Sequence, residues 1–112
     1  MDNENVVVLN SGNYKEFVTA NDKLTLVDFW ARWCLPCRAV APILSDLAEK
    51  YADKIKIGKL DIDENNDIAG MHGITSIPTI LVFKGGEVVE TIIGARPYDD
   101  FKNVVEKYVG GV

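Results

Sequence analysis

Residues 24–37 have the sequence LTLVDFWARWCLPC, an apolar run that leads into the only two cysteines of the chain. Residues 24–30 are too apolar for a half-exposed strand, which favours a central strand covered on both faces. The segment after the cysteines has the apolar periodicity of an amphipathic helix. Two thiols separated by two residues at a strand-to-helix junction are typical of a redox pair, although they could also share a metal ion.

Length and composition limit the class of protein. The chain has 112 residues without repeats or linkers, so we expect one domain over residues 1–112. Twelve basic and seventeen acidic side chains give a net charge of −5, which disfavours nucleic acid and anionic membranes as partners. No apolar run approaches the roughly 18 residues that cross a bilayer. We therefore expect a monomer that binds neither membrane nor nucleic acid.

The cellular location, and the possibility that the cysteines bind a metal ion, decide whether the two cysteines form a redox pair. Residues 1–5 carry no basic flank or long apolar segment, so no secretory signal is predicted and a cytoplasmic protein is expected. In a reducing compartment, neighbouring cysteines are more often reactive than structural. A closed zinc site needs four ligands, and the chain offers two cysteines and the distant His72. We expect no metal site, and we expect His72 at the surface.

Periodicity along the rest of the chain predicts alternating strands and helices. Strands are predicted at residues 6–9, 24–30, 55–62, 79–83 and 87–93, and helices at 13–19, from the cysteines to residue 51, at 65–71 and at 97–109. Gly85 and Gly86 supply the positive φ of a tight hairpin turn. The strand–helix–strand unit should cross over with the right hand, which brings the cysteines to the carboxyl edge of the sheet.

Asp28 is anomalous because it lies inside the apolar run. A bare carboxylate is unfavourable there, so burial should raise its pKa, unless the strand position is solvated. A carboxyl tuned in this way could exchange a proton with Cys37 as a disulfide opens. Lys59 follows Ile55 and Ile57 at period two, so it should share their face. It would then lie near Asp28, or else extend its ammonium group into water.

The two cysteines are expected to have different roles. Cys34 should lie at the helix N-terminus, where unpaired N–H groups and the helix dipole favour the thiolate. Its pKa should therefore lie below the free value of about 8.5. Cys37, one turn further along, is the candidate resolving thiol and is expected to be the more buried of the two.

Several separated motifs resemble the thioredoxin family: residues 27–31 (VDFWA), residues 33–37 (WCLPC), Pro42, residues 59–63 (KLDID), residues 77–79 (IPT) and Gly94. The resemblance covers nearly the whole chain. It implies the α/β thioredoxin fold, with a five-stranded mixed sheet flanked by four helices and the strand order first, third, second, fourth, fifth. At Leu35 the chain departs from members close to bacterial thioredoxin, which carry glycine at a position that helps set redox potential and partner fit.

The resemblance also implies an activity and a site. The activity is that of a protein-disulfide reductase with Cys34 as nucleophile, Cys37 as resolving thiol and Asp28 as proton donor and acceptor. The Ile77–Pro78 bond is implied to be cis and to face the active disulfide. An apolar surface for an extended substrate is expected from Trp33, Leu35, Pro36, Ile77, Pro78 and Gly94.

Cofactor and partners follow from the same resemblance. No cofactor is expected beyond the redox-active disulfide Cys34–Cys37. The expected partners are proteins that contain disulfides and a thioredoxin reductase, linked to NADPH or ferredoxin, that supplies electrons.

Two other functions remain compatible with this pattern. The same fold could be poised as an oxidant or isomerase, since pairs of this type span roughly −270 to −120 mV and Leu35 alone does not fix the potential. The fold could also serve as a non-catalytic binding subunit. Intact Cys34, Cys37, Asp28 and Pro78 argue against the subunit, because a scaffold needs none of them.

Overall fold

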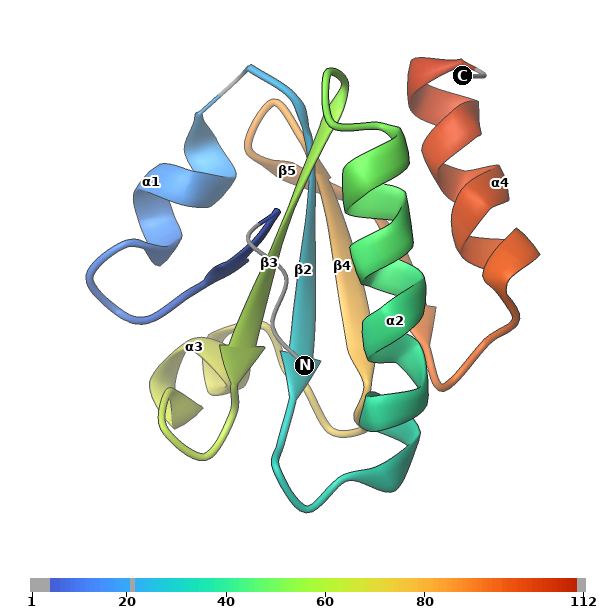
Figure 1. The fold of residues 1–112 in the computed structure, drawn as a ribbon. Coiled ribbons are helices and arrows are strands. Elements are labelled where there is room, and N and C mark those ends of the chain that lie inside the picture. The colour runs from blue at the N-terminus through green and yellow to red at the C-terminus, as the bar shows by residue number, and fades with distance from the viewer. Residues whose placement is uncertain (1–4, 21, 111–112) are drawn as a thin grey trace.

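The computed structural model describes residues 5–20 and 22–110 of the chain. Within them the strands are β1 (Val6–Val8), β2 (Leu24–Trp30), β3 (Ile55–Asp61), β4 (Thr79–Lys84) and β5 (Glu87–Ile93). The helices are α1 (Tyr14–Thr19), α2 (Leu35–Lys50), α3 (Asn66–Met71) and α4 (Tyr98–Val109), as Figure 1 shows.

The strands form one mixed sheet in the order β1-β3-β2-β4-β5. β2 pairs in parallel with β3 and antiparallel with β4, which makes it the central strand. Its residues from Leu24 to Phe29 are all buried, which explains why its sequence is an apolar run rather than an alternating one. The predicted α/β fold, with its five-stranded mixed sheet, four helices and strand order, is confirmed.

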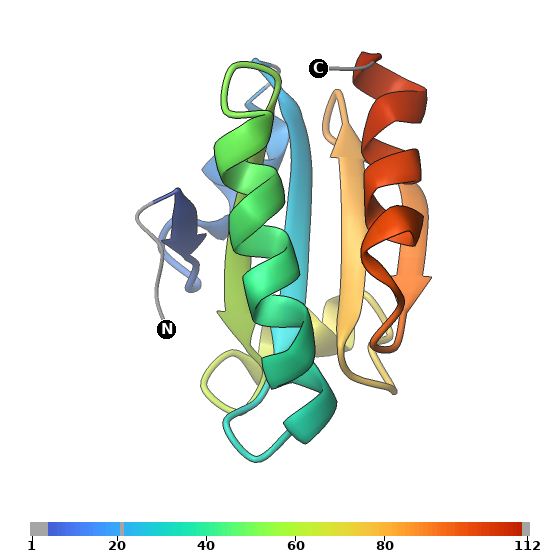
Figure 2. The same cartoon turned by 45° about the vertical axis from the view of Figure 1, so that its right-hand side comes forward.

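Two helices cover each face of the sheet. α2 and α4 pack on the face that carries Leu26 and Ile57 (Figure 2), whereas α1 and α3 pack on the face that carries Val27 and Phe29. On the α1 face the chain approaches β3 very closely at Gly58. A Cβ atom built on this glycine would lie 2.5 Å from Leu9 Cδ1, so the position has no room for a side chain.

Several element ends differ from the prediction by one or two residues. β1 ends at Val8 and β3 at Asp61, and Pro97 precedes α4 as its N-cap instead of lying in its first turn. In contrast, α2 starts at Leu35 directly after its N-cap Cys34, as expected, and continues through Pro42. Gly85 and Gly86 have φ values of 61° and 83°, as the hairpin turn requires. In the described part of the chain, no helix is long and apolar enough to cross a membrane.

The topology gathers several chain segments at one end of the sheet. The carboxyl ends of β2 and β3 meet the amino end of α2 at the lower end of the molecule in Figure 1. The amino end of β4 and the carboxyl end of β5 reach the same end, because Thr79 pairs with Phe29 and with Ile93. Segments far apart in sequence therefore surround the start of α2.

Candidate active site

A disulfide joins Cys34 and Cys37 at the start of α2, with their Cα atoms 5.3 Å apart. Cys34 is the N-cap, and its Sγ accepts a hydrogen bond from the backbone N–H of Cys37 at 3.2 Å. Pro36 in the first turn suits a helix start, because its missing N–H would have no partner inside the helix. The N–H groups and the positive dipole end of α2 thus favour a thiolate at Cys34 once the disulfide opens.

Both cysteines lie in an apolar cluster with Ala31, against which Ile77 packs. Cys34 is 4% exposed and Cys37 is 3% exposed. Cys37 is therefore the more buried of the two, as expected, although the two values differ little. The physical reason is that the disulfide holds both sulfur atoms inside the same cluster.

Asp28 is buried on the face of β2 that α2 covers, with 5% of its surface exposed. Among the described residues its Oδ1 has no hydrogen-bond partner. Burial raises the pKa of Asp28 to about 7, and the positive charge of Lys59 opposes part of that rise. Asp28 can therefore hold or release a proton near neutral pH.

Lys59 lies directly opposite Asp28 in the register of β2 and β3. Its Nζ is also 5.5 Å from the centre of the Trp30 ring, a cation–π distance. The ammonium group thus lies over the Trp30 ring, close enough to Asp28 for its charge to act on the carboxyl.

The segment before β4 also borders the disulfide. The Ile77–Pro78 peptide bond is cis, and Ile77 packs against the cysteine cluster. The carbonyl oxygen of Pro78 accepts a hydrogen bond from Gly94 N–H at 2.9 Å. This bond joins the two segments that flank the β4–β5 hairpin next to the disulfide.

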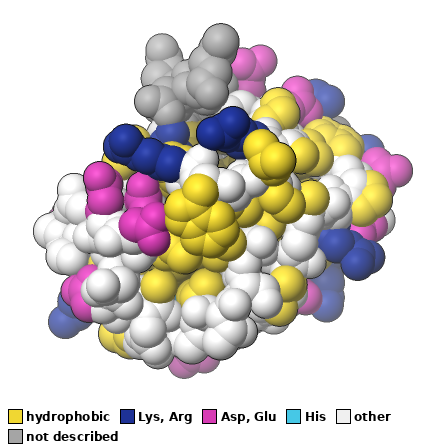
Figure 3. Space-filling view, turned by 90° about the horizontal axis from the view of Figure 1, so that it is seen from below, with side chains coloured by type: hydrophobic (Ala, Val, Ile, Leu, Met, Phe, Trp, Pro, Cys, Tyr) yellow, Lys and Arg dark blue, Asp and Glu magenta, His cyan; other side chains and the backbone are white. Residues whose placement is uncertain are grey.

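The outer surface of this end is apolar although the protein is acidic. Trp33 is 65% exposed, Leu35 is 70% exposed and Pro36 is also exposed. Figure 3, which views this end from below, shows apolar side chains gathered together, with acidic side chains along one border and basic ones beside them. A disulfide that approaches Cys34 must therefore cross an apolar surface.

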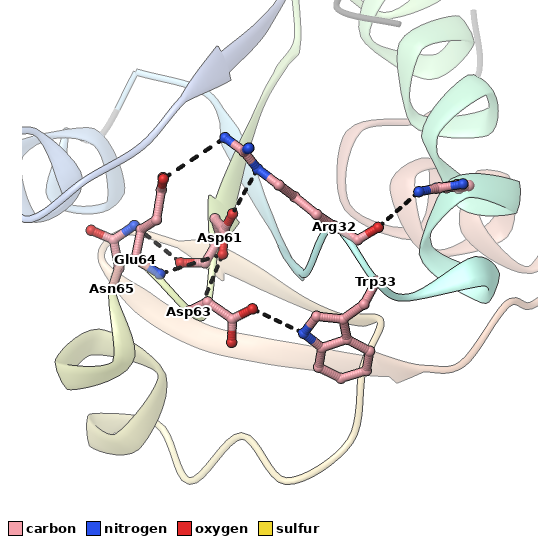
Figure 4. A network of polar contacts seen from close by, with 7 residues as sticks. Arg32, Trp33, Asp61, Asp63, Glu64 and Asn65 are labelled. Carbon is pink, nitrogen blue, oxygen red and sulfur yellow. Dashed lines mark hydrogen bonds and ion pairs between the residues drawn. The ribbon is translucent and has the colours of Figure 1, made fainter.

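A polar network that sequence reasoning did not identify holds Trp33 in place (Figure 4). The Trp33 indole N–H donates to Asp63 Oδ2 at 2.9 Å, and Asp63 N–H donates to Asp61 Oδ1 at 2.8 Å. Arg32 links the same two segments of the chain. Its Nε lies 3.8 Å from an Asp61 carboxylate oxygen, and a terminal nitrogen lies 3.8 Å from a Glu64 carboxylate oxygen. The loop before α2 is thus tied to the loop after β3.

A signal for this network was present in the sequence. Asp61 and Asp63 follow the apolar part of β3, and the carboxyl ends of parallel neighbours β2 and β3 share one edge of the sheet. Acidic residues at that position could have been assigned to the border of the site.

His72 was predicted at the surface, and that prediction is wrong. Its ring is half-buried on the opposite face of the sheet, hydrogen-bonded through Nε2 to the Tyr14 hydroxyl and in edge contact with Phe29 and Phe83. Burial lowers the pKa of His72. Within residues 5–20 and 22–110, no three His, Cys, Asp or Glu side chains are arranged to hold a metal ion.

The geometry defines a class of protein. A Cys-x-x-Cys disulfide capping a helix, with a buried carboxyl of pKa about 7 in the neighbouring strand and an apolar approach, is the site of a thiol–disulfide oxidoreductase. The family model described as Thioredoxin matches residues 5–107. The chain belongs to the thioredoxin family.

Curated relatives support the same assignment. Thioredoxin of Listeria monocytogenes is 52% identical over 89 residues, covering 80% of this chain and 86% of the relative. Thioredoxin of Synechocystis is 43% identical over 101 residues, covering 90% and 94%. A chloroplastic M-type thioredoxin of Chlamydomonas reinhardtii is 48% identical over 101 residues, covering 90% and 72%. The chain is accordingly a protein-disulfide reductase of a family that needs no cofactor beyond its redox-active disulfide.

Proposed function

We propose that Cys34 is the nucleophile of this reductase and that Cys37 is the resolving thiol. The observation that carries the assignment is the position of Cys34 as N-cap of α2, where its Sγ receives the N–H of Cys37. A thiolate at Cys34 is stabilised by that donor and by the helix dipole. Cys37 lies inside the first turn, within reach of Cys34 Sγ.

The proposed reaction has two exchange steps. The Cys34 thiolate attacks one sulfur of a substrate disulfide, which breaks the substrate S–S bond, forms a mixed disulfide and releases the first substrate thiolate to take up a proton. The Cys37 thiol then gives its proton to a base and attacks Cys34 Sγ. This second step releases the other substrate thiol and leaves the Cys34–Cys37 disulfide, so two electrons pass to the substrate.

Asp28 is the proposed base for the second step and the proton donor for the reverse reaction. Its buried position and its pKa of about 7 support this role, because such a carboxyl can take up the Cys37 proton near neutral pH. Lys59 is proposed to limit the rise in the pKa of Asp28, since its positive charge favours the ionised carboxylate. No direct contact with substrate is assigned to either residue.

The proposed substrate surface consists of Trp33, Leu35, Pro36, Ile77, Pro78 and Gly94. The exposed apolar side chains before and after Cys34, and the packing of Ile77 against the cysteine cluster, support it. The substrates are proteins with accessible disulfides, and a thioredoxin reductase, using NADPH or ferredoxin as electron source, regenerates the dithiol. We propose a monomer that acts without membrane or nucleic acid.

A cytoplasmic location is proposed because a reducing compartment keeps the pair in its active dithiol form. The chloroplastic name of the Chlamydomonas relative makes the chloroplast the alternative. Fractionation of the source cells, followed by detection of the native chain, distinguishes the two.

Cysteine variants test the proposed order of events. Cys37→Ser should accumulate a stable mixed disulfide with a disulfide-containing substrate, whereas Cys34→Ser should neither trap substrate nor reduce it. Non-reducing gels and mass spectrometry measure the adduct. If Cys34→Ser keeps turnover while Cys37→Ser forms no adduct, the roles of the two cysteines are reversed or absent.

The reductant direction has its own test. Equilibration with a glutathione buffer measures the reduction potential of the Cys34–Cys37 pair, and a value above about −200 mV would contradict a reductant.

A further inference from the structure

Trp30, the last residue of β2, contacts two parts of the active site. Its half-buried ring packs against the cysteine cluster, and the centre of the same ring lies 5.5 Å from Lys59 Nζ. The indole nitrogen is buried and has no hydrogen-bond partner among the residues that the structure describes. The ring therefore acts on Lys59 through its aromatic face and not through a hydrogen bond.

The alternation of side chains along the strands places Asp28, Trp30 and Lys59 on one face of the sheet. Asp28 and Trp30 are two residues apart in β2, so their side chains point to the same side. Lys59 pairs with Asp28 across the parallel ladder of β2 and β3. The Lys59 ammonium thus has a carboxyl and an aromatic ring as neighbours on the same side of the sheet.

Lys59 is the charged neighbour that acts on Asp28. Burial raises the pKa of Asp28, and the positive charge of Lys59 lowers it. On β4 the residue opposite Asp28 is Ile80, and α4 contributes the apolar Phe101 to this face. From α2, the thiol of Cys37 becomes a further titratable group once the disulfide opens. The position of the Lys59 ammonium therefore influences how readily Asp28 ionises.

A lysine is not held beside a neutral carboxyl by charge alone. Its long side chain rotates freely and can extend the ammonium into water, and protonated Asp28 exerts no ionic attraction on it. An aromatic face attracts an ammonium whether or not a nearby acid is ionised. The Trp30 ring thus provides an attraction that persists while Asp28 carries its proton.

We propose that Trp30 is a positioning residue of this reductase, whose ring holds the Lys59 ammonium beside Asp28 in both protonation states of the carboxyl. The proposal rests on the proposed function, because it assumes that Asp28 takes the proton of Cys37. With the ammonium already in place, the carboxylate is stabilised as soon as it forms. A larger fraction of Asp28 is then ionised near neutral pH and ready to accept the proton.

Removal of the ring should shift the titration of Asp28 to higher pH. A cation–π contact favours the held position of an ammonium by about two- to fivefold, so the midpoint should rise by about 0.3 to 0.7 pH unit in Trp30→Leu. The direction follows because a positive charge that is held less closely favours the carboxylate less. Trp30→Phe keeps an aromatic face and should shift the midpoint in the same direction by a smaller amount.

NMR of the Asp28 carboxyl carbon measures this midpoint in the oxidised full chain, where the cysteines do not titrate. Trp30→Leu is compared with the native residue in two backgrounds, one with Lys59 and one with Lys59→Met. The shift should be present with Lys59 and should fall below about 0.2 pH unit with Lys59→Met. An equal shift in both backgrounds, or a downward or absent shift with Lys59, overturns the proposal. Trp30→Phe gives the same comparison if the leucine variant does not fold.

Phe17→Leu is the matched control. The half-buried ring of Phe17 lies 4.8 Å from the ammonium of Lys56, so this variant also removes a contact between a lysine and an aromatic ring. Phe17 packs in the cluster on the α1 face, away from Asp28. The Asp28 midpoint should not change, and a rise as large as that in Trp30→Leu would overturn the specific role of Trp30.

The rate of the second exchange step separates this proposal from the function on which it rests. A chromogenic aryl disulfide releases one coloured thiolate in each step, so the second release from the reduced protein measures the attack by Cys37. Its pH midpoint should rise in Trp30→Leu together with the NMR midpoint. A shifted NMR titration with an unshifted rate profile would contradict a role of Trp30 in the reaction.

Asp28→Asn tests the underlying function in the same rate measurement. If its pH profile equals that of the native protein, Asp28 is not the base and the proposed function fails. The NMR comparison in the two Lys59 backgrounds does not depend on that result, so it still decides whether Trp30 positions the ammonium.

Discussion

Each face of the sheet holds an acid or base side chain that lies near aromatic rings and whose pKa is shifted by burial. On the α2 face Asp28 lies in the same strand as Trp30, and on the α1 face His72 packs against Phe29 and Phe83. Burial raises the pKa of Asp28 to about 7 and lowers the pKa of His72. The same cause moves the two values in opposite directions, because burial favours whichever form is neutral.

The two groups differ in their hydrogen bonds. His72 is bonded to the Tyr14 hydroxyl, so its neutral ring is part of the packing between α1 and α3. Asp28 has no partner at Oδ1 among the described residues and faces the charge of Lys59. The comparison contrasts a group that is hydrogen-bonded within the packing with a carboxyl whose Oδ1 has no partner among the described residues, and the second arrangement supports the proton exchange proposed for Asp28.

The largest effect is expected from Asp28→Asn. The folded-state pKa of about 7 lies above the ordinary value of 3.8, so the stability contributed by protonated Asp28 is full below pH 3.8 and is lost as the pH rises through 7. Between pH 5 and pH 8 the native protein should lose about 3 kcal/mol relative to the variant. Urea unfolding at the two pH values measures this difference, and parallel losses in both proteins would show that Asp28 does not titrate as described.

Gly58→Ala should disturb the α1 face and leave the Asp28 face intact. The new Cβ would overlap Leu9 and come within 3.0 Å of Phe17, which should push α1 from the sheet and destabilise the protein by about 2 kcal/mol. Chemical denaturation measures the loss. Gly70→Ala is the control, because a Cβ at this helical position meets nothing within 4 Å and should be neutral or slightly stabilising. Equal effects of the two variants would argue against the close approach at Gly58.

His72→Phe should cost about 1 kcal/mol at pH 8, because the Tyr14 hydroxyl loses its partner. His72→Gln, which keeps an acceptor, should lose less. The pKa of His72 is lowered below 6.5, so the stability from its neutral ring is present above pH 6.5 and is lost as the pH falls through the folded-state pKa. Thermal unfolding from pH 8 to pH 4.5 should reveal this acid loss in the native protein and a smaller one in both variants. An identical loss of stability at acid pH in all three proteins would show that the titration of His72 does not cause it.

The smallest effect is expected from combining Asp28→Asn with His72→Gln. Because the two side chains pack on opposite faces of the sheet and share no partner, their changes in unfolding free energy should add within about 0.5 kcal/mol. A double-mutant cycle from urea unfolding measures the coupling. A coupling above about 1 kcal/mol would mean that the faces communicate through β2.

The fold could be predicted from sequence because its central strand is buried on both faces. The unbroken apolar run of β2 identified the strand, and the same run made a raised pKa of Asp28 predictable. The position of Cys34 at a helix start followed from the periodicity of the residues after it. These are local signals, because each depends on neighbours in the chain.

The hydrogen-bond partners of His72 and Asp63 could not be predicted in this way, although the place of Asp63 at the border of the site could have been. The hydrogen bond of His72 joins residues 58 positions apart, and that of Asp63 joins residues 30 positions apart. Both contacts depend on how loops and short helices pack at the ends of the sheet, which the periodicity of the sequence does not report. The exposure of Leu35, in contrast, was expected from the resemblance to the family and not from periodicity, since its neighbours Cys34 and Cys37 are buried.

The hydrogen bond from Gly94 to Pro78 bears on how this protein could be re-engineered. Cys34, Cys37 and Asp28 all belong to the unit from β2 to β3, whereas Ile77, Pro78 and Gly94 belong to the two ends of the β4–β5 hairpin. Part of the proposed substrate surface is therefore encoded apart from the thiols, in segments that reach the disulfide end of the sheet through the pairing of β4 with β2. Exchanging residues 77–94 between relatives, with Cys34, Cys37 and Asp28 unaltered, would measure how much of the partner preference this block carries.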